Sequence, residues 1–249
     1  MKTILIVITI LLLTVSCQSS DDSAEAISID YTQISSSTND ECIDQAIIGV
    51  SMPVMITAAC YTKYSAYIDP LNKIPLLVSS VLDGSHVHSD YERVYEIVND
   101  PNIDIGYQAV NDDYAGSGFD RAHLSAWADM GALSHAIETN FYTNIVPLYP
   151  SVNRGVWLDL ENKVRDWALI VGELVVLTGV IDSGESIGKG VALPSYIYKV
   201  IYDEEHEVAT AYVVPNMQLS YSADIDEYVV SIDELELMTG VDFFINKEE

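Results

Sequence analysis

Basic residues are scarce in this chain. Its 249 residues include 38 Asp and Glu against 11 Lys and Arg, which gives a formal net charge of −27. A protein that coats nucleic acid needs a basic surface, so this composition argues against that class. It does not exclude a polyanionic substrate at a locally basic site. The arginines all lie in the middle of the chain, which fits either one anion-handling region or solvated side chains on helices and strands: Arg93, Arg121, Arg154 and Arg165.

Long hydrophobic runs are missing after the N-terminus. Residues 4–13 are largely apolar and follow Lys2, but this run is too short to span a bilayer, which takes about 20 residues. The pattern predicts a signal peptide over residues 1–16. The sequence before Cys17 is close to a lipoprotein cleavage site, so Cys17 is a candidate for lipidation, with plain secretion as the alternative. We therefore expect an exported protein that is periplasmic, anchored to the outer membrane or extracellular.

Cysteine is also rare. Residues 17–45 are rich in Ser, Asp and Glu and are predicted to form a flexible acidic tether. Residues 46–246 are predicted to form the folded domain. Besides Cys17 there are two cysteines, Cys42 and Cys60, which are candidates for a disulfide in an exported protein; the alternative is two buried thiols.

Several common signatures are absent from the sequence. It shows no internal repeat, no phosphate-binding loop and no GxSxG turn. His86 and His88 have strand spacing and could supply half of a zinc site, but no Cys or Glu nearby completes it. An exposed loop or edge strand is the simpler interpretation of these two histidines.

The hydrophobic pattern predicts an α+β fold with a mostly antiparallel sheet, because strands precede and follow one long helix without regular alternation. That helix is predicted over residues 151–173 from apolar residues at helical spacing. A helix over 126–140 and a closing helix over 231–244, with Ser231 as its N-cap, are also expected. The predicted strands cover residues 64–69 and 73–82, as a hairpin, then 174–181 and 206–216, and residues 190–205 are predicted to form either one strand or two.

The segment "FDRAH" places Asp120, Arg121 and His123 together. A histidine beside an arginine is suited to activate water next to a phosphodiester, because the cation stabilises charge that develops on phosphorus. Asn153, at the start of the long helix, could cap that helix or give its carbonyl oxygen to Mg²⁺. Glu161 is eight residues further on, about 12 Å along a helix, so both side chains are not expected to touch one ion directly.

Together these motifs resemble the DNA/RNA non-specific endonuclease family of the ββα-metal (His-Me finger) class. The family's Asp-Arg-Gly-His signature corresponds to residues 120–123, with Ala122 in place of glycine. Its later motifs correspond to "TNIVP" at 143–147 and "NRGVWLDLE" at 153–161. Further matches extend the resemblance over residues 49–244: "LTG" at 177–179, the strand at 192–203, "VVPN" at 213–216 and the segment 231–244.

The resemblance implies a ββα-metal nuclease fold and a Mg²⁺-dependent hydrolase that cuts DNA and RNA by gripping the phosphate backbone and leaves 5′-phosphates. Mn²⁺ is expected to substitute. The implied site residues are His123 as general base, Asn153 as the direct metal ligand, Glu161 acting through a metal-bound water, and Arg121 with Arg93 at the phosphate. Arg154 is a further candidate for substrate binding, and Asp120 is expected to have a structural role.

The glycine-to-alanine departure at Ala122 matters if that backbone requires a positive φ. The alternative to an enzyme is therefore a catalytically silent exported lipoprotein that keeps the nuclease fold as a binding module. The full set of candidate catalytic side chains argues against it, because a binding module has no need of them.

Overall fold

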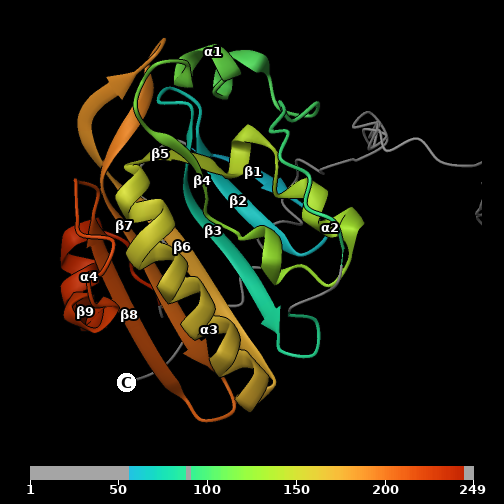
Figure 1. Ribbon diagram of the computed structural model, residues 1–249, viewed down its shortest axis with the longest axis vertical. Helices are drawn as coiled ribbons and strands as arrows, with labels where there is room; N and C mark the ends of the chain where they lie inside the picture. The colour runs from blue at the N-terminus through green and yellow to red at the C-terminus, as the bar shows by residue number, and fades with distance from the viewer. Residues whose placement is uncertain (1–55, 88–90, 244–249) are drawn as a thin grey trace, which may run out of the picture. The chain divides into compact units, whose positions relative to one another are not determined.

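The computed structural model describes residues 56–87 and 91–243. Its main element is a seven-stranded antiparallel sheet in the order β1-β2-β3-β6-β7-β8-β9 (Figure 1). A separate hairpin consists of β4 (Asp120–His123) and β5 (Ile145–Leu148). The strands of the large sheet are β1 (Thr57–Cys60), β2 (Tyr64–Asp69), β3 (Ile74–Asp83), β6 (Glu173–Ile187), β7 (Val191–Asp203), β8 (Val208–Pro215) and β9 (Val229–Val230). The helices are α1 (Asn111–Tyr114), α2 (Leu133–Glu138), α3 (Trp157–Val171) and α4 (Ile232–Thr239).

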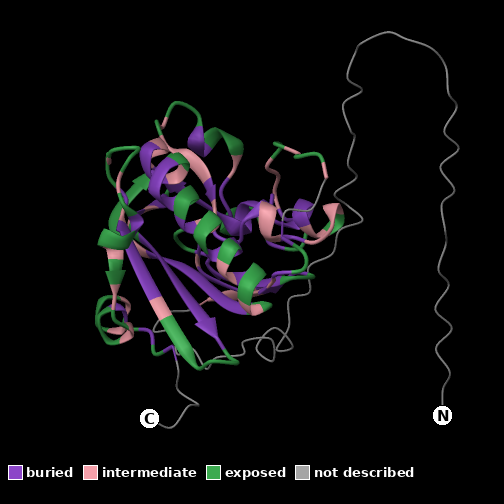
Figure 2. Cartoon of the chain, turned by 60° about the horizontal axis from the view of Figure 1, so that its bottom comes forward, coloured by how far each residue is buried: buried purple, intermediate pink, exposed green. Residues whose placement is uncertain are grey.

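The central strands are buried on both faces. Successive side chains of a strand point to opposite sides of a sheet, so the buried and largely apolar first half of β6, residues 174–180, needs a cover on each side. On one side, Val175 and Leu177 pack in a cluster with Leu235 of α4 and Phe243. On the other side, α3 crosses the sheet (Figure 1). The strands are accordingly largely buried, whereas the helices expose one face (Figure 2).

Local sequence signals explain both longer helices. The apolar stripe of α3 is buried at Trp157, Leu160 and Val164, as its helical spacing predicts. In α4, the Ser231 hydroxyl accepts a hydrogen bond from the Glu234 amide, and the Glu234 carboxylate accepts one from the Ser231 amide. This reciprocal capping box confirms the predicted start of α4.

Most of the predicted elements are confirmed. The hairpin β2–β3 and the antiparallel α+β architecture appear, and the segment predicted as one strand or two forms one strand, β7. The continuous helix predicted over 126–140 is wrong: a 3₁₀ turn at Trp127–Asp129 is separated from α2 by extended backbone at Met130 and Ala132. The amide of Asn144 bonds the backbone of Ser125 and Thr139, which holds this segment in a looped path that helical propensity does not reveal.

The signal peptide at 1–16, Cys17, the tether over 17–45 and Cys42 lie outside the described residues. Cys60 is disulfide-bonded, but its pairing with Cys42 stays a prediction. Among residues 56–87 and 91–243, no helix has the length and apolar character needed to cross a membrane.

Candidate active site

One cleft brings the candidate residues together. β4 and β5 pair with Asp120 opposite Leu148 and His123 opposite Ile145, and α3 follows β5 after a wide helical turn. This strand–strand–helix unit forms one wall of a cleft of about 750 Å³. The other wall comes from residues 93–97 and from Asn140. All four arginines of the chain line this cleft, so the structure favours a single anion-handling region over scattered solvated arginines.

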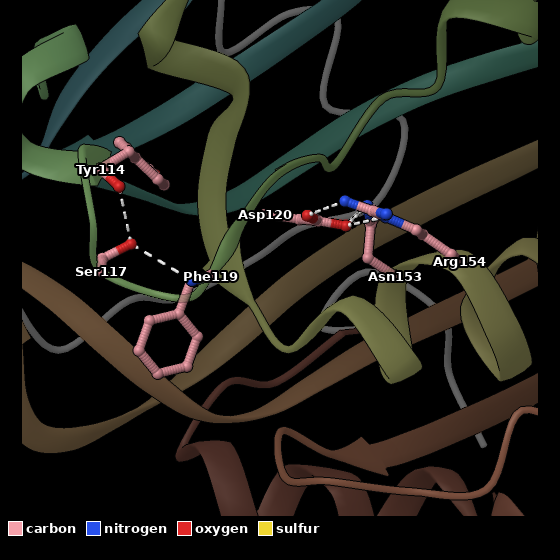
Figure 3. Close-up of polar contacts among 6 residues, drawn as sticks. All are labelled: Tyr114, Ser117, Phe119, Asp120, Asn153 and Arg154. Atoms are coloured by element: carbon pink, nitrogen blue, oxygen red, sulfur yellow. Dashed lines mark hydrogen bonds and ion pairs between the residues drawn. The ribbon is translucent and has the colours of Figure 1, made fainter.

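The turn before β4 sets the position of the motif. The Ser117 hydroxyl donates to the Tyr114 carbonyl (2.9 Å) and accepts from the Phe119 amide (3.2 Å), as Figure 3 shows. Gly116 and Gly118 have positive φ values of 71° and 84°, which glycine adopts at low cost. The chain can therefore reverse immediately before Asp120.

His123 is held in a defined orientation by Asn140. Its Nε2 lies 2.9 Å from the Asn140 side-chain oxygen, while the Asn140 Nδ2 donates to the Val94 carbonyl at 3.0 Å. Because the amide nitrogen is committed to Val94, the amide oxygen must accept and His123 Nε2 must carry the hydrogen. In the neutral ring, Nδ1 is then the atom with a free lone pair, and it can accept a proton in the cleft.

The surroundings of His123 favour its neutral form. Burial lowers its pKa from 6.5 to about 4; the hydrogen bond with Asn140 opposes this effect, and the charge of Arg93 adds to it. His123 is thus unprotonated at neutral pH, which is the state that a general base requires.

Asn153 and Arg154 both bind Asp120 (Figure 3). The Asn153 Nδ2 donates to Asp120 Oδ2 (3.0 Å), and Arg154 makes two bonds, from Nε to Oδ2 (2.7 Å) and from Nη2 to Oδ1 (2.6 Å). These contacts lower the pKa of Asp120 and outweigh the opposing effect of its burial. Asp120 thus contacts two neighbouring side chains, one of which, Asn153, is the side chain predicted to bind metal.

Asn153 does not cap the long helix. It lies in a π-helical turn, Val152–Val156, which precedes the α3 start at Trp157. Gly155 in this turn departs from helical geometry (φ −113°, ψ −116°) and sets the turn apart from α3. Such wide turns are frequent at functional sites. Here the turn places Asn153 and Arg154 beside β4.

Glu161 is a half-buried carboxylate in the same cleft. Burial raises its pKa from 4.5 to about 7; the charge of Asp129 adds to this, and Lys199, Arg165 and Arg93 oppose it. Within the part of the chain that the structure describes, its oxygens accept no hydrogen bond. A carboxylate kept in this state costs stability, which suggests a role other than holding the fold together.

Replacing Glu161 with glutamine is expected to stabilise the metal-free protein at alkaline pH. The stability that comes with the raised pKa is present below pH 4.5 and is lost as the pH rises through about 7. Glutamine does not titrate, so Glu161→Gln should be more stable at pH 8 by on the order of 2 kcal/mol, after a discount for partial exposure. Urea unfolding in EDTA at pH 4.5 and pH 8 measures this, with Glu173→Gln, at the exposed first residue of β6, as the control. An equal stability of variant and wild type at pH 8 would contradict the expectation.

Arg121 is fixed by three neighbours. Its Nε donates to the Tyr142 hydroxyl (3.2 Å), its Nη2 donates to the Asn111 side-chain oxygen (2.5 Å), and its guanidinium lies 5.2 Å from the centre of the Tyr114 ring. Arg93, also predicted at the phosphate, lies over the rings of Tyr95 and Trp127 in the opposite wall of the cleft. Both guanidinium groups are therefore positioned before a ligand arrives.

Arg165 and Asn140 are among the cleft residues to which the sequence assigned no role. Arg165 is 3% exposed and binds Asp129 (2.7 Å) and the Asn162 side chain (2.8 Å). Its spacing of four residues from Glu161 on α3 puts both on one helix face, a signal that could have identified it. Asn140, the partner of His123, belongs to no motif in the sequence and could not have been found.

Ala122 does not strain the strand. It is fully buried in regular β4, in register with Val146. Among the non-glycine residues that the structure describes, positive φ values occur only at Lys73 and Glu207. The residue that replaces the family's glycine thus fits its backbone without a left-handed conformation.

The oxygens in the cleft fit a hard cation. With its Nδ2 donated to Asp120, Asn153 keeps its side-chain oxygen free of hydrogen bonds to other described residues, and the Glu161 carboxylate lines the same cleft. Mg²⁺ prefers such oxygen ligands and needs few of them. The structure adds no support for a zinc site at His86 and His88. His86 binds Asp83 (2.9 Å), and His88 lies outside the described residues. Among the described residues, no group of three or more His, Cys, Asp or Glu side chains is placed to hold a metal ion.

Comparison with known proteins decides the family. The model of the DNA/RNA non-specific endonuclease family matches residues 44–249. The chain belongs to this family. The match spans the large sheet, the β4–β5 hairpin, α3 and every residue of the cleft described above.

Relatives in the DNA/RNA non-specific endonuclease family include two human proteins. The chain is 30% identical to "Nuclease EXOG, mitochondrial" over 208 residues, which is 75% of this chain and 56% of that protein. It is 30% identical to "Endonuclease G, mitochondrial" over 203 residues, which is 74% of this chain and 68% of that protein. It spans just over half the length of the EXOG relatives. A solved structure described as the "EndoG/EndoGI complex" matches with a TM-score of 0.69 and 26% identity over 80% of this chain and 89% of that one.

Proposed function

We propose that the protein is a metal-dependent endonuclease that hydrolyses phosphodiester bonds in DNA and RNA and releases 5′-phosphorylated products. The observation that carries the proposal is the geometry of His123, whose free Nδ1 lies in a cleft that also holds Asn153 and Glu161. Two pre-positioned arginines, Arg93 and Arg121, line this cleft as well. The nuclease names of the relatives support the same reaction class.

Each of these side chains has a separate role in the proposed reaction. His123 Nδ1 takes the proton of the attacking water, while Asn140 keeps the ring in the required tautomer. Arg121 and Arg93 offset the negative charge that builds up on the phosphate. Asn153 would hold Mg²⁺ directly and Glu161 through water, and Mn²⁺ is expected to substitute. When bound, this cation acts as a Lewis acid and stabilises the leaving 3′ oxygen.

The chemistry of the cleft accounts for the proposed cleavage of both DNA and RNA. Its charged groups suit the phosphate backbone, which DNA and RNA share, and phosphate contacts carry no sequence information. The acidic remainder of the chain keeps other phosphate contacts few. Cleavage of both nucleic acids without sequence preference follows from this arrangement.

We also propose that the enzyme acts outside the cytoplasm. The signal-peptide pattern of residues 1–16 supports export, and Cys17 supports a lipid anchor. The relatives named above are mitochondrial by their names, which describe those proteins only. Labelling of the wild type but not of Cys17→Ser with a lipid precursor would test the anchor.

Purified wild-type protein is expected to convert supercoiled plasmid to nicked and then linear DNA, and to degrade RNA, when Mg²⁺ is present but not in EDTA. The conversion of circular DNA demonstrates endonuclease action, because a circle offers no end. End-labelling of the products determines whether the phosphate stays on their 5′ ends. Failure to cut in Mg²⁺, Mn²⁺ and Ca²⁺ alike would favour the silent binding module.

A further inference from the structure

We propose that Tyr95 forms a base-stacking platform beside the cleft and that the enzyme consequently prefers unpaired, single-stranded segments of its substrate. This inference rests on the proposed nuclease function and adds the structural class of nucleic acid that the site takes. It concerns a contact with the bases, whereas the residues discussed above act on the phosphate and its charge.

Tyr95 is an exposed aromatic side chain in a mostly polar cleft. It is 83% exposed and lines the cleft together with Arg93 and Glu96. Leu158, on α3, is the other large hydrophobic side chain that is exposed in the described lining of this cleft, at 42%. An aromatic ring left in water at the edge of a binding site offers a flat apolar surface that is buried only when a ligand covers it.

The ring lies next to a phosphate-binding group. The guanidinium of Arg93 lies 5.7 Å from the centre of the Tyr95 ring and 5.9 Å from that of the buried Trp127. With so much of the side chain exposed, one face of the Tyr95 ring remains open. In a nucleotide, one sugar separates the phosphate from its base, so a phosphate held at Arg93 places a neighbouring base within reach of this ring.

The backbone beside Tyr95 is bonded to Asn140, in the segment that connects β4 and β5. The Val94 carbonyl accepts the hydrogen bond from Asn140 Nδ2, and Val98 donates to the Asn140 carbonyl (3.0 Å). The same Asn140 side chain contacts His123. A platform anchored in this way loses little conformational freedom on binding, which favours a stacking contact.

A base in duplex nucleic acid can stack on Tyr95 only after it has left the duplex, which costs free energy. Its bases are already stacked and paired, and extruding one base costs a few kcal/mol. In a single strand every base presents an open π-face, and stacking on an aromatic side chain contributes about 1–3 kcal/mol per base without sequence preference. Tyr95 therefore favours single strands over duplexes while leaving the choice of sequence open.

The test measures binding in EDTA, so that cleavage does not intervene. A single-stranded oligonucleotide carrying 2-aminopurine is titrated with wild type, Tyr95→Ala and Tyr95→Phe, and the quenching of its fluorescence reports stacking. We expect Tyr95→Ala to lose the quenching and to bind about 10-fold more weakly. Tyr95→Phe should retain both, and the duplex of the same sequence should bind all three proteins alike.

Tyr107→Ala is the matched control, because Tyr107 is also exposed but lies outside the cleft. Equal single-strand binding by Tyr95→Ala and wild type would overturn the inference, and so would an equal loss on single strand and duplex. Absence of any binding by the wild type would also overturn it. Binding with Tyr95-dependent quenching but without metal-dependent cleavage would instead overturn the nuclease function and leave the stacking platform standing.

Discussion

His123→Ala is expected to lower kcat/KM on plasmid DNA by about 10²–10⁴-fold, the usual contribution of a positioned general base. The structure gives the reason: with Nε2 directed at Asn140, Nδ1 is the one ring atom free to take a proton in the cleft. Initial rates of nicking at saturating Mg²⁺ measure the loss. KM should change much less than kcat, because the imidazole contributes to the reaction step more than to binding.

His206→Ala provides the control for this variant. His206 is bonded to Asp203 (2.8 Å) and lies outside the cleft, so its removal should leave the rate unchanged. A His123→Ala enzyme with wild-type kcat would assign the base elsewhere. An NMR titration of the metal-free protein adds an independent check, since the imidazole of His123 should protonate near pH 4, well below the ordinary 6.5.

Asp120→Ala is expected to raise the Mg²⁺ concentration needed for half-maximal activity by about 10- to 100-fold, the usual cost of losing a group that orients a metal ligand. Asp120 accepts the amide hydrogen of Asn153 and thereby leaves the amide oxygen available to a cation. Loss of the carboxylate frees the amide to rotate. The Mg²⁺ dependence of nicking, rather than the rate at one concentration, is the informative measurement.

Arg154 provides the matched second mutation. Both of the hydrogen bonds described above for its side chain go to Asp120, so we expect Arg154→Ala also to raise the Mg²⁺ concentration needed for half-maximal activity, but by less. The double variant should then resemble Asp120→Ala alone, because Arg154 acts through Asp120. Additive effects, with a separate rise in KM for DNA, would support the sequence hypothesis that Arg154 binds substrate directly.

A changed Mg²⁺ requirement or KM in Arg154→Ala is not expected to come from a folding defect. The Arg154 side chain is 65% exposed, and exposed ion pairs contribute little to stability. Equal urea midpoints for wild type and Arg154→Ala would separate the positioning effect from loss of structure.

The sequence predicted the parts of this protein that depend on local patterns. Apolar periodicity identifies α3, alternating and continuous apolar runs identify the antiparallel strands, and the capping box identifies α4. The motif around His123 and the segment from Asn153 to Glu161 identify the family. These features are readable because each is encoded within one helix or strand.

The features that the sequence did not predict depend on contacts between distant segments. The looped path around α2 follows from hydrogen bonds made by Asn144, and the tautomer of His123 follows from Asn140 and Val94. The exposure of Tyr95 likewise depends on how residues 93–97 lie against the hairpin. No pattern within a single element encodes these contacts, because each joins residues brought together by the fold.

The gathering of all four arginines in one cleft has a consequence for how the enzyme moves between cuts. A nuclease with basic surfaces outside its site stays on DNA and diffuses along it. In this chain the net charge of −27 repels a polyanion that is not seated in the cleft. Each encounter should thus end in release after a single cut. All molecules of a long substrate should then become shorter at the same rate, instead of some being fully degraded while others are still intact.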